Sequence, residues 1–283
     1  MAITHIPGPT WLRIFSRNRG SVVAAFILAA LFALAILAPI FLRFEPGRIN
    51  VGPSMSPPDL THLMGTDELG RDVFSRATAG LSVSLMVGFG AASISTFLGI
   101  LVGGLAGFFG RGTDAVLMRL TEVFQVIPRF FLAVLLVAFF GASIVNILVT
   151  IAVLSWPEIA RLVRGEFLSL RSRQFVDAAR VAGASRMSLI FVEILPNALG
   201  PVVVNATLMV GQAMLLEAGL SYLGLGDPTR ASLGQMLQEA QQLMRSAWWT
   251  TAFPGLLIFL CVLSLNLVGD GLTDILNPRS RER

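Results

Sequence analysis

Six apolar runs, most of them long enough to cross a lipid bilayer, constrain this chain more than any other feature of its sequence. A helix that spans a bilayer needs about 20 mostly apolar residues, and the fourth run is short for this. Backbone amides in hydrocarbon must find partners within their own segment, so each run is predicted to be a helix. The six runs are Ser21–Leu42, Leu81–Phe109, Val123–Phe140, Ser143–Ile159, Leu199–Leu216 and Trp248–Val268.

The composition supports a chain that lies in lipid. Only 13% of the residues are charged, about half of the share usual in soluble domains. The first run follows Arg13, Arg17 and Arg19 as the apolar part of a signal peptide would, but it is longer than the roughly 7–15 residues of such a segment. We therefore predict an all-α integral membrane protein with six spanning helices, the first of them uncleaved.

The arginines predict the orientation of these helices. The chain has 21 basic residues, and all of them are arginines. With the N-terminus inside, fifteen lie in cytoplasmic segments and six outside, a bias that favours both termini in the cytoplasm. Because the arginines occupy short loops rather than one polar module, the net charge of +4 indicates membrane orientation and not nucleic-acid binding.

We divide the chain into three parts. Residues 1–80 comprise a cytoplasmic N-terminal segment, the first span and an outer loop. Residues 81–275 form a five-helix core with a cytoplasmic loop at 161–197, and residues 276–283 form a cytoplasmic tail. The single cysteine, Cys261, lies in an apolar run and is expected to be a packing residue, whereas His5 and His62 lie outside every run. No metal site and no catalytic residue are therefore expected.

Two features inside the apolar runs predict local structure. Gly99, Gly103 and Gly107 recur every four residues in the second run, a spacing that lets a neighbouring helix approach closely. Pro128 is expected to separate an amphipathic segment, Asp114–Glu122, from the third span proper. Arg129 next to it can extend to the cytoplasmic interface.

The outer segment between the first two runs combines turn residues with ion pairs. Asp67 with Arg71, and Asp72 with Arg76, place an acid four residues before a base, the favourable order on a helix. Thr66 or Asp67 could cap the N-terminus of such a helix. We therefore expect a helix here that leads into the second span.

The long cytoplasmic loop is predicted to hold two short helices. The first should end at Gly183, which suits the left-handed position after a helix. The second could be capped by Ser185 or Ser188 and should end before Pro196. Ala179 and Gly183 leave one face of the first helix nearly bare, so this face could either enter a groove on another protein or pack against the spans of this chain.

This loop resembles that of the permease subunits of binding-protein-dependent ABC importers. The matching residues are Asp177, Ala178, Ala179, Gly183, Leu195 and Pro196, with Asp where the family more often has Glu. In that family the loop forms the coupling helix, which docks on the ATPase subunit. The resemblance thus implies an ATPase-coupling role for these six residues.

Three further stretches are similar to the second, or C-type, permeases of dipeptide, oligopeptide and nickel importers. They are Gly65–Asp72, Leu220–Gly226 and Asn266–Leu272, the last followed by Asn277-Pro278-Arg279, while Leu233 stands where the family often has Trp. The resemblance implies the type I importer permease fold and a multi-pass location in a bacterial or archaeal cytoplasmic membrane. It also implies as partners a homologous permease, two ATP-binding subunits and an extracytoplasmic solute-binding protein.

The energy source is expected to be another chain. A phosphate-binding P-loop requires a lysine, and this sequence has none, so ATP and Mg would be used by the partner ATPase and this chain would bind no cofactor. On its predicted side of the membrane, the outer segment with Asp67, Arg71, Asp72 and Arg76 is a candidate docking site for the solute-binding protein.

Two other classes of protein stay open as alternatives. An ion-coupled secondary transporter would place an ionisable residue within the bilayer, and Glu217 is the candidate, as a pathway or gate residue or as a hydrogen-bond partner of a neighbouring helix. An intramembrane aspartyl protease would pair Asp227 with Asp270 or Asp274. The predicted topology separates these carboxyl groups by a hydrocarbon core of about 30 Å.

Overall fold

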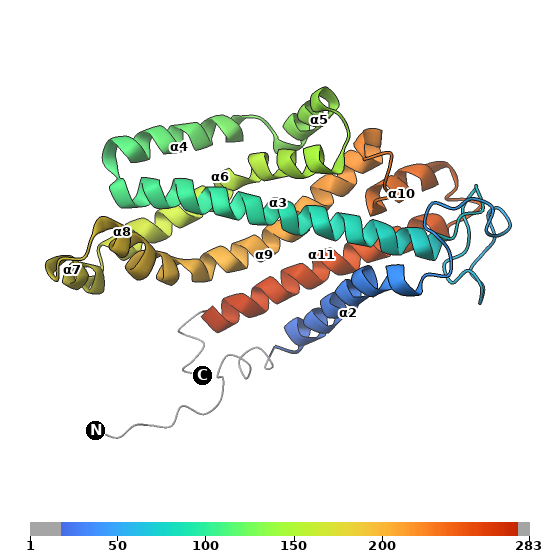
Figure 1. Cartoon of the computed structure of the whole chain (residues 1–283), viewed down its shortest axis with the longest axis horizontal. Helices are drawn as coiled ribbons and strands as arrows, with labels where there is room; N and C mark the ends of the chain where they lie inside the picture. The colour runs from blue at the N-terminus through green and yellow to red at the C-terminus, as the bar shows by residue number, and fades with distance from the viewer. Residues whose placement is uncertain (1–17, 277–283) are drawn as a thin grey trace, which may run out of the picture.

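The computed structural model describes residues 18–276, and this part of the chain is a bundle of long helices without a β-strand (Figure 1). Arg13, Arg17, nearly all of the tail 276–283 and the Asn277–Arg279 motif lie outside the described residues. The helices are α2 (Arg19–Phe41), α3 (Val73–Phe109), α4 (Arg111–Val126), α5 (Arg129–Phe140), α6 (Ile144–Arg171), α7 (Gln174–Val181), α8 (Arg186–Ser188), α9 (Leu195–Leu220), α10 (Leu233–Glu239) and α11 (Trp249–Leu276). Two π-helical turns, η1 (Leu189–Ile194) and η2 (Ser221–Leu225), flank α9, and a 3₁₀ turn, η3 (Ala240–Gln242), follows α10.

Five stretches of helix are long and apolar enough to cross a membrane, and the number is six if a bent pair of helices counts as one span. The five are Arg19–Ala38, Val73–Phe109, Ile144–Arg171, Arg186–Leu225 and Trp249–Ile275. Helices α4 and α5 pass the same test together but bend by 82°. Because α3 ends and α6 begins at opposite ends of the bundle, the bent pair carries the chain from one end to the other (Figure 1).

The third predicted span is divided as expected, whereas the fourth is longer than expected. The third run is divided at Pro128, as predicted, because proline lacks an N–H group and keeps the residue before it out of the helical conformation. The fourth, predicted to be short, belongs to the 28-residue α6. The helix continues to Arg171, and two of its charged residues are paired with neighbouring helices: Glu158 with Arg129 of α5, and Arg164 with Asp114 of α4. Residues 161–171 are therefore helix and not loop.

Helices α3 and α6 pack closely through glycine. A Cβ atom on Gly103 would overlap the carbonyl oxygen of Ala160, and one on Gly107 would lie 2.6 Å from Cβ of Phe167. Neither position can hold a larger side chain unless the backbones separate. The predicted role of these glycines in helix packing is confirmed.

Replacing Gly103 with alanine should therefore lower the free energy of unfolding, by about 1–3 kcal/mol as for other overpacked sites. Gly165 of α6 is the matched control, since nothing lies within 4 Å of a Cβ atom there. Gly165→Ala should instead raise the stability by about 0.5–1 kcal/mol through helix propensity. Thermal unfolding of the purified chain in detergent, followed by tryptophan fluorescence, measures both; equal effects of the two changes would contradict the packing assignment.

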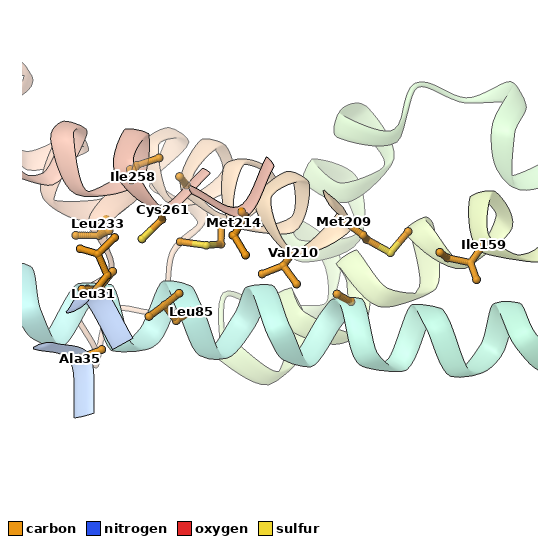
Figure 2. Packing of buried hydrophobic residues seen from close by; sticks show 14 of the residues in the cluster. Leu31, Ala35, Leu85, Ile159, Met209, Val210, Met214, Leu233, Ile258 and Cys261 are labelled. Atoms are coloured by element: carbon orange, nitrogen blue, oxygen red, sulfur yellow. The ribbon is translucent and has the colours of Figure 1, made fainter. Parts of the chain in front are cut away.

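The main core lies where α2, α3, α9 and α11 meet (Figure 2). Leu31 of α2 and Leu85 of α3 face Met214 of α9 and Cys261 of α11. Cys261 is fully buried and has no disulfide partner, which confirms its predicted packing role. Helix α9 is thus held between the other long helices, and the two elements that flank it, η1 and η2, lead to the candidate functional segments at the two ends of the bundle.

Candidate coupling segment, outer ion-pair cluster and buried carboxylate

The segment α7–α8 projects from one end of the bundle (Figure 1). Helix α7 ends in a Schellman motif: the N–H of Gly183 donates to the carbonyl of Arg180 at 3.1 Å, and the N–H of Ala184 donates to that of Ala179 at 3.0 Å. Gly183 takes a φ of +88°, which glycine adopts without a steric penalty. Ser185 then accepts a hydrogen bond from the N–H of Ser188 and caps α8. Both predicted helix boundaries are confirmed.

The small-residue face of α7 is divided between the bundle and the surface. Val176 is buried and Ala179 packs against the core, so this side of α7 holds the helix to its own chain. Asp177, Ala178 and Gly183 are exposed, and nothing lies within 4 Å of a Cβ atom placed on Gly183. The bare face was expected either to pack against the spans of this chain or to be free for another protein. Ala179 packs against the core of this chain, whereas Gly183 lies on a free surface.

The helix after the loop does not end before Pro196, contrary to the prediction. Helix α8 continues through η1 into α9, with Pro196 in the first turn of α9. In η1 the N–H of Leu195 donates to the carbonyl of Ile190, five residues earlier, and this wider turn accommodates a proline that cannot donate. Leu195 and Pro196 therefore lie on the long helix after η1, apart from the surface formed by Asp177 and Gly183.

The outer segment forms a loop and not the predicted helix. Gly65 and Gly70 take φ angles of +73° and +64°, outside the right-handed helical region. Asp72, rather than Thr66 or Asp67, caps the next helix: its carboxylate accepts from the N–H of Ser75 at 2.8 Å, and α3 begins at Val73.

The ion pairs of this segment differ from those predicted. Asp67 does pair with Arg71, with Nε and Oδ2 2.6 Å apart. Arg76 pairs with Asp67 at 2.9 Å and with Glu239 of α10 at 2.8 Å, and not with Asp72. We call Asp67, Arg71, Arg76 and Glu239 the outer ion-pair cluster. Sequence reasoning missed Glu239 because it lies 163 residues from Arg76 and no local spacing connects the two.

Asp72 has a different partner, His62. The Nδ1 atom of this buried histidine lies 2.9 Å from Oδ1 of Asp72, and its ring stacks on Phe44. In the same loop, the backbone N–H groups of His62 and then Thr61 hold the pKa of the Asp59 carboxyl below its usual range. These contacts fold the segment onto the beginning of α3.

Glu217 is almost fully buried near the end of α9. Its carboxylate accepts from the hydroxyl of Ser84 on α3 at 2.9 Å and from the hydroxyl of Ser221 on η2 at 2.7 Å. The carboxylate thus connects α3 to the turn that precedes α10. The hydrogen bond to a neighbouring helix is present as predicted, and a role in the pathway or as a gate stays a prediction.

The aspartates of the protease alternative do not meet. Asp227 accepts from the N–H of Ile144 at the start of α6. Asp274 lies at the end of α11, 3.2 Å from the amide of Asn18 at the start of α2. These contacts place the two carboxyl groups at opposite ends of the bundle (Figure 1), too far apart to share a proton.

Comparison with known sequences identifies the family. Residues 95–282 match the family described as binding-protein-dependent transport system inner membrane component. Residues 10–58 match the N-terminal TM domain of oligopeptide transport permease C.

Two relatives align along nearly the whole chain. The dipeptide transport system permease protein DppC of Alkalihalophilus pseudofirmus is 38% identical over 94% of this chain and 88% of its own. The oligopeptide transport system permease protein OppC of Bacillus subtilis is 35% identical over 95% of this chain and 88% of its own.

A solved structure shares the fold. A chain of the inward-facing MetNI methionine ABC transporter aligns with 70% of this chain and 94% of its own length, with a TM-score of 0.58 at 22% identity. This likeness agrees with the all-α membrane architecture. The chain therefore belongs to the binding-protein-dependent ABC importer permeases, in the dipeptide and oligopeptide group of the C type.

Proposed function

We propose that this chain is one of two permease subunits of an importer that moves peptides or similar small solutes inward, driven by ATP hydrolysis on partner subunits. One observation carries the proposal: α7 projects from the bundle and ends at Gly183, whose surroundings are open to another protein. The names of the relatives, dipeptide and oligopeptide permeases, support peptides as the solute. Nickel chelates are a second candidate from the resemblance to the nickel permeases.

The proposed assembly contains this chain, a homologous permease, two ATP-binding subunits and an extracytoplasmic solute-binding protein, in a bacterial or archaeal cytoplasmic membrane. ATP and Mg belong to the ATP-binding subunits, and this chain binds neither. Closure of those subunits would push on Asp177–Gly183. Because Val176 and Ala179 join α7 to the core, the push would reach α6 and α9 and open the pathway outward.

The outer segment would receive the solute-binding protein. Asp67, Arg71 and Arg76 would act there by holding the loop to α10 through Glu239, since their charges are already paired. Asp72 would hold the start of α3. The exposed side chain of Leu69 offers a position for a cross-linker aimed at the binding protein.

Reconstitution of the complete importer in liposomes tests the proposal. We expect uptake of a labelled dipeptide only with ATP and the binding protein present, unchanged by ionophores that collapse ion gradients. A cross-linker at Leu69→Cys should reach the binding protein. Uptake that follows an ion gradient without ATP would indicate a secondary transporter, and cross-links to the ATP-binding subunits alone would invert the topology.

A further inference from the structure

Three carboxamide side chains lie along one side of the membrane-spanning helix α9. Asn197, Asn205 and Gln212 are spaced by eight and seven residues. At 3.6 residues per turn these positions fall within an arc of about 80°. We call these three residues the amide face of α9.

The Asn205 and Gln212 side chains of the amide face have no partner among the residues that the structure describes. Neither the Asn205 nor the Gln212 side chain makes a hydrogen bond within residues 18–276, and Gln212 is exposed. An amide without a partner in hydrocarbon costs several kcal/mol. Polar side chains inside a bilayer almost always face other protein or a water-filled cavity. The amide face is therefore not suited to contact with lipid tails.

Two members of the amide face, Asn197 and Asn205, border a groove of about 420 Å³, and Gln212 lies two turns of α9 beyond Asn205. The lining of the groove comes from three helices and includes Leu162 of α6, Asn197, Pro201, Asn205 and Leu208 of α9, and Thr273 of α11. No charged side chain lines it. Pro201 has no N–H group, so the carbonyl oxygen of Asn197 lacks its usual helical donor. The groove thus offers hydrogen-bonding groups without formal charge.

Helix α11 adds to this pattern from the other side. Asn266 is exposed and lies seven residues before Thr273, which places both on one face of α11. The Asn266 side chain also has no hydrogen-bond partner within the described part of the chain. Unpartnered carboxamides therefore occur on both long helices that border the groove.

We propose that the amide face of α9 lines the solute pathway and binds the backbone of a passing peptide. A carboxamide carries one acceptor oxygen and two N–H donors, which match the N–H and C=O groups of a peptide bond. An uncharged lining attracts neither acidic nor basic side chains, so it suits peptides of varied sequence. This inference rests on the proposed importer function and adds the residues that the solute would meet.

Cysteine accessibility tests the inference, because the chain has a single cysteine, and it is buried. In a Cys261→Ala background, Asn205→Cys and Gln212→Cys are compared with Val203→Cys. Val203 is 49% exposed, lies two residues from Asn205 and points about 160° away from it around the helix. The three variants are assembled into the complete importer in liposomes and treated with a charged, membrane-impermeant thiol reagent.

We expect N205C and Q212C to react at least tenfold faster than V203C, and a dipeptide delivered by the binding protein to slow their reaction. Reaction no faster than that of V203C would overturn the inference. So would disulfide cross-linking of N205C or Q212C to the homologous permease, which would make the amide face a subunit interface.

The readout separates this inference from the proposed function. Labelling is scored whether or not the importer takes up dipeptide. Fast labelling of N205C and Q212C in an importer that moves no dipeptide would support the pathway and refute the proposed solute. As a second measurement, Q212L should lower uptake at least tenfold without loss of binding-protein-stimulated ATP hydrolysis, whereas V203L should not; equal uptake by Q212L and the parent would count against the pathway.

Discussion

Gly183→Trp is expected to abolish uptake and to remove the stimulation of ATP hydrolysis by the binding protein, while membrane insertion stays normal. A Cβ atom at this position meets no atom of the chain within 4 Å, so the indole would not clash with its own bundle. Within the chain, the substitution forces a residue other than glycine to take a φ of +88°, which lowers the stability by about 1–2 kcal/mol. The larger effect should come from the bulk that the indole places between α7 and the ATP-binding subunit.

Gly183→Asn is the matched control, because asparagine is among the residues that enter the left-handed region most readily. It should retain most of the uptake if steric access decides the effect. Insertion and thermal stability of both variants are measured in membranes and in detergent. Normal uptake by G183W would refute the coupling role of α7, and equal loss in both variants would trace the effect to backbone strain instead.

Arg76→Ala is expected to be the most destabilising change at the end of the bundle where α3 begins. Arg76 is only 5% exposed and bridges Asp67 to Glu239. Its loss leaves the carboxylates of Asp67 and Glu239 to share the single guanidinium of Arg71. Breaking a buried pair costs about 3–5 kcal/mol when one charge is left alone, and the remaining pairs with Arg71 and the partial exposure of Glu239 place the expected value toward the lower end. The fall in the melting temperature of the purified chain measures it.

Arg71→Ala serves as the comparison, because its guanidinium is more exposed and Asp67 keeps Arg76 as a partner. It should destabilise the chain by less than half as much as R76A. Combining Asp67→Asn with R76A should recover part of the loss, since the single guanidinium of Arg71 then faces one buried carboxylate and not two. An equal fall in melting temperature for R71A and R76A would show that the burial of the arginine does not decide how much it stabilises the chain.

Local rules of sequence were sufficient for much of the fold. The apolar runs placed the crossings, because unpaired backbone amides cannot stay in hydrocarbon. The glycine spacing in α3, the break at Pro128 and the ends of α7 and α8 at Gly183 and Ser185 also followed from a few neighbouring residues. Each of these features depends on backbone geometry or on one capping hydrogen bond, and both are encoded within a turn or two.

The features that the sequence did not predict depend on contacts between distant segments. Arg76 pairs with Glu239 and Asp67 and not with Asp72. Folding brings α10 against α3, and the carboxylate of Asp72 caps α3 instead. Helix α6 continues where a loop was expected, and there Glu158 and Arg164 form ion pairs with α5 and α4 that join segments far apart in the sequence.

The same division holds for the candidate functional sites. The residues of α7 could be named from their order in the chain, since helix ends are local. That Asn197 and Asn205 of the amide face border a groove depends on the placement of α6, α9 and α11 around it. A spacing of seven or eight residues shows that side chains share a face, but the packing of neighbouring helices decides whether that face is buried, in lipid or along a groove.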